Sequence, residues 1–177
     1  MYWFLPWVWT TNWLESFLGQ GEPVVAELTD EHLDAAAELH SEAFDQSWSG
    51  DELGTLLAQR GSFGYVVRQP ALVNGPPLGF VLARNVGGEA EILTITVARR
   101  NRRAGIGRLL MDNVLQKLHA DRAHSLFLEV DEENEPALRL YKRLRFEEVG
   151  RRPAYYQHPD GRRTSALTLK RSLSREG

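Results

Sequence analysis

An arginine-rich turn with two glycines most constrains the fold, because it joins a strand-like run to an amphipathic helix. Residues 99 to 108 read RRNRRAGIGR, and the preceding run ILTITV is rich in β-branched residues. After the turn, apolar residues recur at helical spacing: Ile106, Leu109, Leu110, Val114 and Leu118. Free main-chain amides at the start of such a helix favour a bound anion. The pattern therefore predicts a phosphate-binding turn, with a solvated basic turn as the alternative.

The turn matches neither of two common nucleotide-binding motifs. It lacks the Gly-Lys-Ser/Thr ending of a P-loop, and no acidic partner follows as in the dinucleotide fingerprint. The chain carries 21 Lys and Arg against 24 Asp and Glu, a formal net charge of -3. A broad basic surface for nucleic acid is therefore excluded. We expect local anion binding and no direct nucleic-acid partner.

The length of 177 residues suits one well-buried domain. Strand and helix patterns run from residue 23 to residue 173, which we predict to form that domain. The chain has no cysteine, which excludes disulfides and a thiol nucleophile and makes a reducing cytoplasm the natural location. The five histidines, at 32, 40, 119, 124 and 158, show no metal-ligand spacing, so we expect no metal.

Residues 1 to 22 form a separate, aromatic-rich appendage in this interpretation. They hold four of the five tryptophans and no Lys or Arg. The apolar part is too short to span a bilayer, and a secretory signal is not indicated. We expect residues 1 to 20 to contact the domain or a partner, with an interfacial membrane anchor as the less favoured alternative.

The remaining patterns predict a mixed α+β domain. VVAEL predicts a first strand, Asp30 a helix cap, and Ser49-Gly-Asp-Glu52 a capping box that opens a second helix. SFGYVV, LGFVLARNV and AEILTITV predict an antiparallel meander. The helix after the arginine turn is followed by a strand, SLFLEV, by a helix capped at Asn134 and by a hairpin around the turn HPDG.

A second group of polar residues lies downstream of the turn. Glu129 sits within the apolar strand SLFLEV, where desolvation would make its carboxylate a stronger base. Tyr141 lies on the following helix and could donate a proton. Taken alone, Glu129 is equally well read as a strand residue that points to solvent.

The spaced motifs together resemble the GNAT superfamily of acyl-CoA-dependent N-acetyltransferases. Arg102-Arg-Ala-Gly105-Ile-Gly107 is similar to the family's Arg/Gln-x-x-Gly-x-Gly/Ala turn. Residues 128 to 161 are similar to the branch that acetylates N-terminal alanine of ribosomal proteins: Leu-Glu-Val, an Asn five residues after the Glu, Leu-Tyr ending seven residues after the Asn, and a Tyr-Tyr pair before an Asp-Gly turn. The resemblance covers residues 24 to 171 and implies a twisted, mixed, mostly antiparallel sheet flanked by helices.

The resemblance also implies a co-substrate, acetyl-CoA, and residues that hold it. The backbone of Ile95, Thr96 and Val97 would pair with the pantetheine arm, and Asn134 would contact the co-substrate as well. The CoA pyrophosphate would lie on the turn formed by Arg102, Arg103, Ala104, Gly105, Ile106, Gly107 and Arg108.

For the chemistry, the resemblance implies Glu129 as general base and Tyr141 as general acid. Trp48, Ser49, Tyr155 and Tyr156 would line the acceptor side, although a core or surface role for the aromatic residues stays open. The expected acceptor is the N-terminal alanine of a small-subunit ribosomal protein. A lysine side chain or a small-molecule amine is an alternative acceptor, and a non-catalytic acyl-CoA-binding module is a second alternative.

Three departures from the family pattern bear on the acceptor and on the helix ends. Arg145 stands where the family usually has glycine, at a helix C-terminus. Ser165 replaces a common acidic residue, and Ala98-Arg99 replaces Asp-Pro. Arg99 and Arg100 lie beyond the family motif, so a solvated face and a contact with the 3′-phosphate of CoA are both open for them.

Overall fold

The computed structural model describes residues 21–70 and 75–173. The elements in chain order are β1 (Val24–Glu27), a 3-10 turn η1 (Asp30–His32), α2 (Leu33–Ser41), α3 (Gly50–Leu57), β2 (Ser62–Arg68), β3 (Gly79–Val86), β4 (Glu89–Val97), a 3-10 turn η2 (Arg99–Asn101), α4 (Ile106–Ala120), β5 (Ser125–Asp131), α5 (Glu135–Arg143), β6 (Glu147–Gln157) and β7 (Arg163–Ser172). The predicted order of strands and helices is confirmed.

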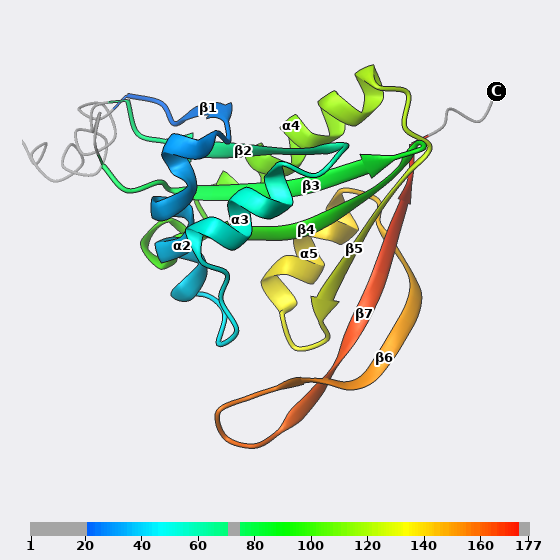
Figure 1. Cartoon of the computed structure of the whole chain (residues 1–177). Helices are drawn as coiled ribbons and strands as arrows, with labels where there is room; N and C mark the ends of the chain where they lie inside the picture. The colour runs from blue at the N-terminus through cyan, green and yellow to red at the C-terminus, as the bar shows by residue number, and fades with distance from the viewer. Residues whose placement is uncertain (1–20, 71–74, 174–177) are drawn as a thin grey trace, which may run out of the picture.

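The strands form one mixed sheet in the order β1-β2-β3-β4-β5-β7-β6. Strands β4 and β5 run parallel, while every other neighbouring pair is antiparallel. Helices α2 and α3 cover one face, and α4 and α5 lie on the other (Figure 1). The α+β class and the helix-flanked, mostly antiparallel sheet are therefore confirmed.

The parallel strands β4 and β5 separate along their length. They are paired only where Glu89 to Glu91 face Ser125 to Phe127. A β-bulge interrupts the register of β3 with β4 just beyond, between Leu82 and Ala83. Because bulges increase local twist, the carboxyl-terminal part of β4 diverges from β5. This leaves a strand edge in the middle of the sheet, next to the turn that follows β4.

Two apolar clusters hold the helices to the sheet. Of the five apolar residues predicted for this helix, Leu109 is partly buried and four are buried between α4 and the sheet: Ile106, Leu110, Val114 and Leu118. Met111 completes the buried face. On the other face, Leu53 of α3 and Phe80 of β3 are fully buried in a second cluster. Burial of this kind contributes about 1.5–3 kcal/mol for each large apolar side chain, so both helix layers are fixed firmly against the sheet.

The helix caps agree with the sequence at one site and correct it at another. The capping box is confirmed, since the Ser49 hydroxyl accepts from the Glu52 amide at 3.3 Å and the Glu52 carboxylate accepts from the Ser49 amide at 2.8 Å. The cap predicted at Asp30 is wrong, because Thr29 is the N-cap and bonds to the His32 ring at 3.1 Å. Asp30 lies inside the first turn, where its negative charge interacts favourably with the positive end of the helix dipole.

The predicted appendage at residues 1 to 22 lies almost wholly outside the described residues. Within residues 21–70 and 75–173, no helix is both long and apolar enough to cross a membrane.

Candidate active site

The turn between β4 and α4 presents its main-chain amides to solvent. Gly105 is the N-cap of α4 with φ of 82°, a left-handed conformation that glycine adopts without strain, and Arg103 has φ of 65°. The amides of residues 105 to 108 have no acceptor among the described residues. A Cβ atom at Gly105 would meet nothing within 4 Å, so a ligand can approach the main chain. The turn thus has the geometry of an anion site at a helix N-terminus.

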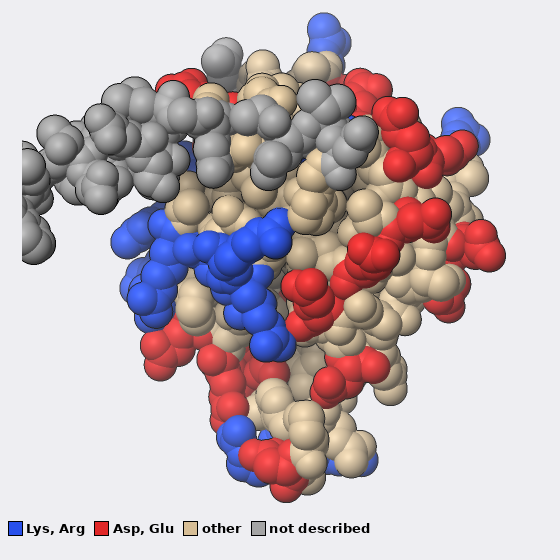
Figure 2. All heavy atoms as spheres, turned by 90° about the vertical axis from the view of Figure 1, so that its left-hand side faces the viewer, with Lys and Arg blue, Asp and Glu red and all other residues tan. Residues whose placement is uncertain are grey.

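Arginine side chains surround this turn. Arg102, Arg103 and Arg108 are exposed. On the side of the molecule where the β4–α4 connection lies, Lys and Arg form one group that is bordered by Asp and Glu (Figure 2). The basic character is therefore local, as the overall net charge of -3 requires. Charge-assisted hydrogen bonds from such arginines would strengthen binding of a pyrophosphate.

The two outer arginines have structural partners. Arg99 donates from Nη2 to the carbonyl oxygen of Glu42 at 3.0 Å, which ties the end of α2 to the β4–α4 connection. Arg100 donates to Asn101 Oδ1 at 3.3 Å. Arg99 therefore holds the segment between α2 and α3 in place.

The segment Ile95 to Val97 borders the opening between β4 and β5. Ile95 and Val97 pack toward α4, whereas Thr96 lies opposite Phe80 and is buried on the other face. The hydroxyls of Thr94 and Thr96 have no hydrogen-bond partner in the described part of the chain. Because these residues lack pairing to β5, their main chain is available to an extended ligand.

Glu129 points away from the α4 and α5 layer. Its neighbours Leu128 and Val130 are buried in the cluster beneath α4 and α5, so the alternation of β5 turns Glu129 to the opposite face. Its side chain is 31% exposed and pairs with Arg152 of β6 at 3.1 Å. The expectation of a desolvated carboxylate is therefore wrong, because the strand is buried on only one of its two faces at this position.

One tyrosine, Tyr156, lies near Glu129, and a second, Tyr141, lies near Tyr156. Tyr141 is 4% exposed, and its ring packs 5.6 Å from that of Phe146. Burial raises the pKa of Tyr141 to about 12, with a smaller contribution from Tyr156. Burial and then the negative charge of Glu129 raise the pKa of Tyr156 to about 12 as well. Tyr156 is therefore close to Glu129 on one side and to Tyr141 on the other.

Asn134 begins α5 next to this group. Its side-chain oxygen accepts from the Ala137 amide at 3.3 Å, so the predicted cap is confirmed. Helix α5 approaches α4 closely at Gly107, where a Cβ atom would lie 3.4 Å from Leu140. Gly107 therefore lies against the Leu140 side chain of α5 beside the opening in the sheet.

His40 positions Trp48, which is predicted to line the side of the site where the acceptor binds. The amide of Trp48 donates to His40 Nδ1 at 3.1 Å, and the two rings stack 5.2 Å apart with an interplanar angle of 9°. Phe44 stacks on the His40 ring at 4.5 Å. Ser49 is occupied by its capping role. Sequence reasoning missed His40, although its spacing on α2 placed it on the buried face.

Protonation of His40 is expected to destabilise the fold. Burial lowers the pKa of His40, and only an unprotonated Nδ1 can accept the Trp48 amide. The unfolded residue binds a proton near pH 6.5, while the folded residue does so only at lower pH. The contribution of neutral His40 to the free energy of unfolding is therefore complete above about pH 6.5 and is lost as the pH falls below that value. The urea midpoint of the unsubstituted protein should therefore fall between about pH 7.5 and 5.5, and that of His40→Gln should fall by less. An equal fall in both proteins would show that His40 does not cause the pH dependence.

The predicted site residues gather at one end of the sheet. The end of β5, the α2–α3 connection and the β6–β7 hairpin all extend to the same end of the molecule (Figure 1). Tyr155 of the hairpin is 53% exposed, with its ring 5.1 Å from that of Tyr156. Arg152, which no sequence pattern singled out, joins the group through Glu129. No direct contact joins Trp48 or Ser49 to Glu129 among the interactions of the described residues.

Within the described ranges, no three His, Cys, Asp or Glu side chains are grouped so as to hold a metal ion.

Comparison with known proteins places this geometry in a family. The profile of the acetyltransferase (GNAT) family matches residues 27–146. The [ribosomal protein bS18]-alanine N-acetyltransferase of Haemophilus influenzae is 29% identical over 132 residues, which are 75% of this chain and 86% of that protein. The crystal structure of the Escherichia coli ribosomal-protein-S18-alanine N-acetyltransferase superposes with a TM-score of 0.79 at 27% identity, covering 88% of this chain and 97% of that chain.

A more distant structure holds the co-substrate. The crystal structure of Arabidopsis thaliana NAA60 in complex with acetyl-CoA superposes with a TM-score of 0.74 at 19% identity, covering 85% of this chain and 98% of that chain. At that identity the likeness concerns the fold alone. The family match, together with the free amides of the turn and the separated strands, leads to one conclusion: the chain belongs to the GNAT family of acetyltransferases and uses acetyl-CoA.

Proposed function

We propose that the protein transfers the acetyl group of acetyl-CoA directly to the α-amine of a protein N-terminus, with the N-terminal alanine of a small-subunit ribosomal protein as acceptor. The observation that carries the proposal is the opening between β4 and β5, beside which Glu129 lies, with Tyr156 close to Glu129 and also to Tyr141. Two relatives that span most of the chain are named for this reaction on ribosomal protein bS18.

The general base in this proposal is Glu129. An amine attacks a thioester only when it is neutral, so the incoming α-ammonium must lose a proton. Glu129 faces the α2 and α3 side of the sheet with 31% of its side chain exposed, so it is open to an acceptor or to a bridging water. Holding amine and thioester together lowers the barrier further, because the reaction becomes effectively unimolecular.

In this proposal Tyr141 takes the place of a general acid as a hydrogen-bond donor to the leaving sulfur. With its pKa raised to about 12, the phenol is protonated at neutral pH and has a hydrogen to donate. A thiol titrates near 8.5, so a full transfer to the free thiolate would be uphill. We therefore assign Tyr141 a hydrogen bond to the sulfur while the carbon–sulfur bond breaks. The attacking nitrogen loses its second proton to solvent as the amide forms, and the thiolate takes a proton from solvent as CoA leaves.

The acceptor side in this proposal is walled by aromatic residues. Trp48 is held by His40, and Tyr155 and Tyr156 lie edge to face on the hairpin. Bulky walls favour a small first side chain such as that of alanine, since a larger one would have to displace a ring. The hairpin itself is fastened to the end of β5, where Arg151 pairs with Glu132 at 2.7 Å and Arg162 with Glu133 at 2.8 Å.

An acceptor panel tests this function. Peptides beginning with alanine should be acetylated in the presence of acetyl-CoA, while the same peptides with a blocked α-amine and a free lysine should not. Preference for the lysine or for a small amine would replace the proposed acceptor. CoA binding without any acetylated product would favour a non-catalytic module.

Arg152 is expected to compete with the acceptor for Glu129. It pairs with Glu129 at 3.1 Å, and its guanidinium also lies 5.5 Å from the centre of the Tyr155 ring. Arg152 can therefore keep the cation–π contact with Tyr155 when an acceptor displaces it from Glu129. An exposed pair of this kind reduces the fraction of free carboxylate only modestly. Arg152→Gln should therefore lower the KM for the acceptor peptide about two- to fivefold and leave the KM for acetyl-CoA unchanged.

Arg163→Gln is the matched control for this prediction, because Arg163 lies on the same hairpin, is exposed and forms no ion pair among the described residues. It should leave the acceptor KM within about twofold of the parent value. A rise in acceptor KM for Arg152→Gln would contradict competition and indicate that Arg152 binds the acceptor.

A further inference from the structure

Arg145 occupies a helix end that normally selects glycine. The Phe146 amide donates to the Tyr141 carbonyl at 3.0 Å, and the Arg145 amide donates to the Lys142 carbonyl at 3.0 Å. These two bonds, with the packing of Phe146 on Tyr141, are the Schellman motif that ends α5. Arg145 has φ of 61° at the position where the motif favours glycine. Retaining arginine there costs stability, so its side chain calls for a compensating role.

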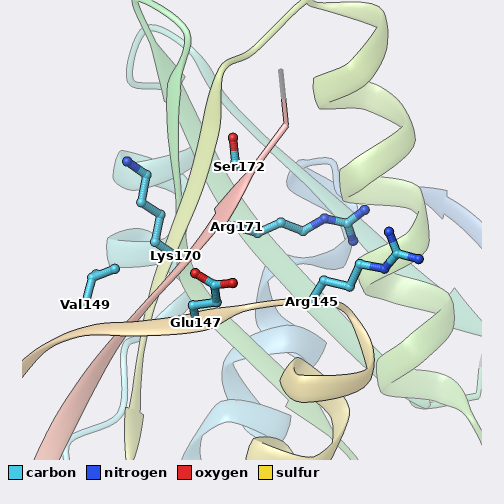
Figure 3. Close-up of a pocket in the computed structure, with 6 residues that line it drawn as sticks. All are labelled: Arg145, Glu147, Val149, Lys170, Arg171 and Ser172. Carbon is cyan, nitrogen blue, oxygen red and sulfur yellow. The ribbon is translucent and has the colours of Figure 1, made fainter. Parts of the chain in front are cut away.

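The Arg145 side chain lies beside that of Arg171. Both line a hollow of about 390 Å³ at the start of β6 and the end of β7. In Figure 3 the two guanidinium groups lie side by side and point toward α4, while Lys170 and Val149 point the other way. No carboxylate among the described residues forms an ion pair with Arg145 or Arg171.

The charges around this pair are unbalanced. Burial and repulsion by Arg145 lower the pKa of Arg171, and Arg108 of α4 acts in the same direction. The nearby Asp112 is committed to Arg108 at 2.8 Å, and Glu147 is the carboxylate that lines the hollow. The positive charges of Arg145 and Arg171 are therefore only partly balanced by nearby carboxylates. An anion with two negative charges, such as a phosphate monoester, would stabilise the two guanidinium groups together.

We propose that Arg145 and Arg171, assisted by Arg108, bind the 3′-phosphate of acetyl-CoA. Arg108 is the last residue of the turn whose free amides suit a pyrophosphate, and its positive charge is near enough to Arg171 to lower the pKa of that residue. CoA carries its 3′-phosphate on the same ribose that bears the pyrophosphate, so the two anionic groups are near each other.

Calorimetric titration of the full chain with CoA and with 3′-dephospho-CoA tests the proposal without relying on turnover. The unsubstituted protein should bind CoA about tenfold more tightly than dephospho-CoA. Arg145→Gly and Arg171→Gln should each weaken CoA about five- to tenfold and leave dephospho-CoA unchanged. Arg145→Gly should also raise the melting temperature, because glycine relieves the positive φ; this shows that the variant is folded.

Lys170→Gln is the matched control, since it removes the same charge from the neighbouring position on β7 but from a side chain that points away (Figure 3). It should not change the ratio of the two affinities. Equal loss of affinity for both coenzymes in Arg145→Gly and Arg171→Gln would overturn the assignment. Equal affinity of the unsubstituted protein for CoA and dephospho-CoA would also overturn it.

Discussion

Glu129→Gln is expected to lower kcat for an N-terminal alanine peptide by about 10²- to 10⁴-fold, the range that general-base catalysis contributes. Glutamine keeps the shape of the side chain but cannot accept the ammonium proton. The fold should not change, because Glu129 lies on the open face of β5 and its partner Arg152 is itself largely exposed. The rate is measured as release of the CoA thiol, with the KM for each substrate determined separately.

The control for this prediction is Glu148→Gln, which removes a carboxylate from β6 whose contact is with Arg151 at 3.6 Å. It should retain kcat within about twofold. CoA binding by Glu129→Gln should match that of the parent protein, which separates lost chemistry from lost structure. An undiminished rate in Glu129→Gln would show that another group takes the proton.

Tyr141→Phe is expected to lower kcat by about 10²-fold, the lower end of the range for acid catalysis. Phenylalanine preserves the buried ring and its packing on Phe146, so the substitution removes only the hydroxyl. The KM values for acetyl-CoA and for the peptide should change little, because the hydrogen bond to sulfur forms as the bond breaks. Single-turnover measurement of CoA release reports this step directly.

Tyr65→Phe on β2 is the matched control, since burial also raises the pKa of this half-buried phenol. It lies on a strand away from the opening between β4 and β5, so its loss should leave kcat unchanged. If Tyr141→Phe also turned over at the parent rate, the leaving thiolate would not need this phenol.

Periodicity and turn chemistry were enough to predict the framework of the site. The apolar face of α4 follows from Ile106, Leu110 and Val114, and the turn follows from Gly105 and the strand before it. The cap at Asn134 could be predicted as well, because a side-chain oxygen before a proline in the first turn has few other roles. These features depend on residues close together in the chain, and the structure confirms them.

Contacts between distant segments could not be predicted in the same way. The pairing of Glu129 with Arg152 depends on the register between β6 and β7, which shifts between Arg152 and Tyr156. No local pattern encodes that shift. The expectation of a desolvated Glu129 failed for the same reason, because the sequence shows the apolar neighbours but not which face of β5 stays open.

The departure at Arg145 shows a different limit. The sequence marks a residue that is unfavourable at a helix C-terminus, and the structure confirms that the helix nevertheless ends in the glycine-type motif. Only the structure shows that the side chain lies beside Arg171. The sequence alone shows that arginine is unfavourable at the backbone position of residue 145. It does not show the neighbouring charge of Arg171, which lies 26 residues further along the chain.

The most direct test of the account is to locate the acetyl group on one peptide that offers both kinds of amine. The peptide begins with alanine, carries an internal lysine, and is incubated with the protein and acetyl-CoA. Fragment mass spectrometry should find the added acetyl group on the alanine α-nitrogen, with none on the lysine. Acetylation of the lysine alone would contradict the proposed acceptor.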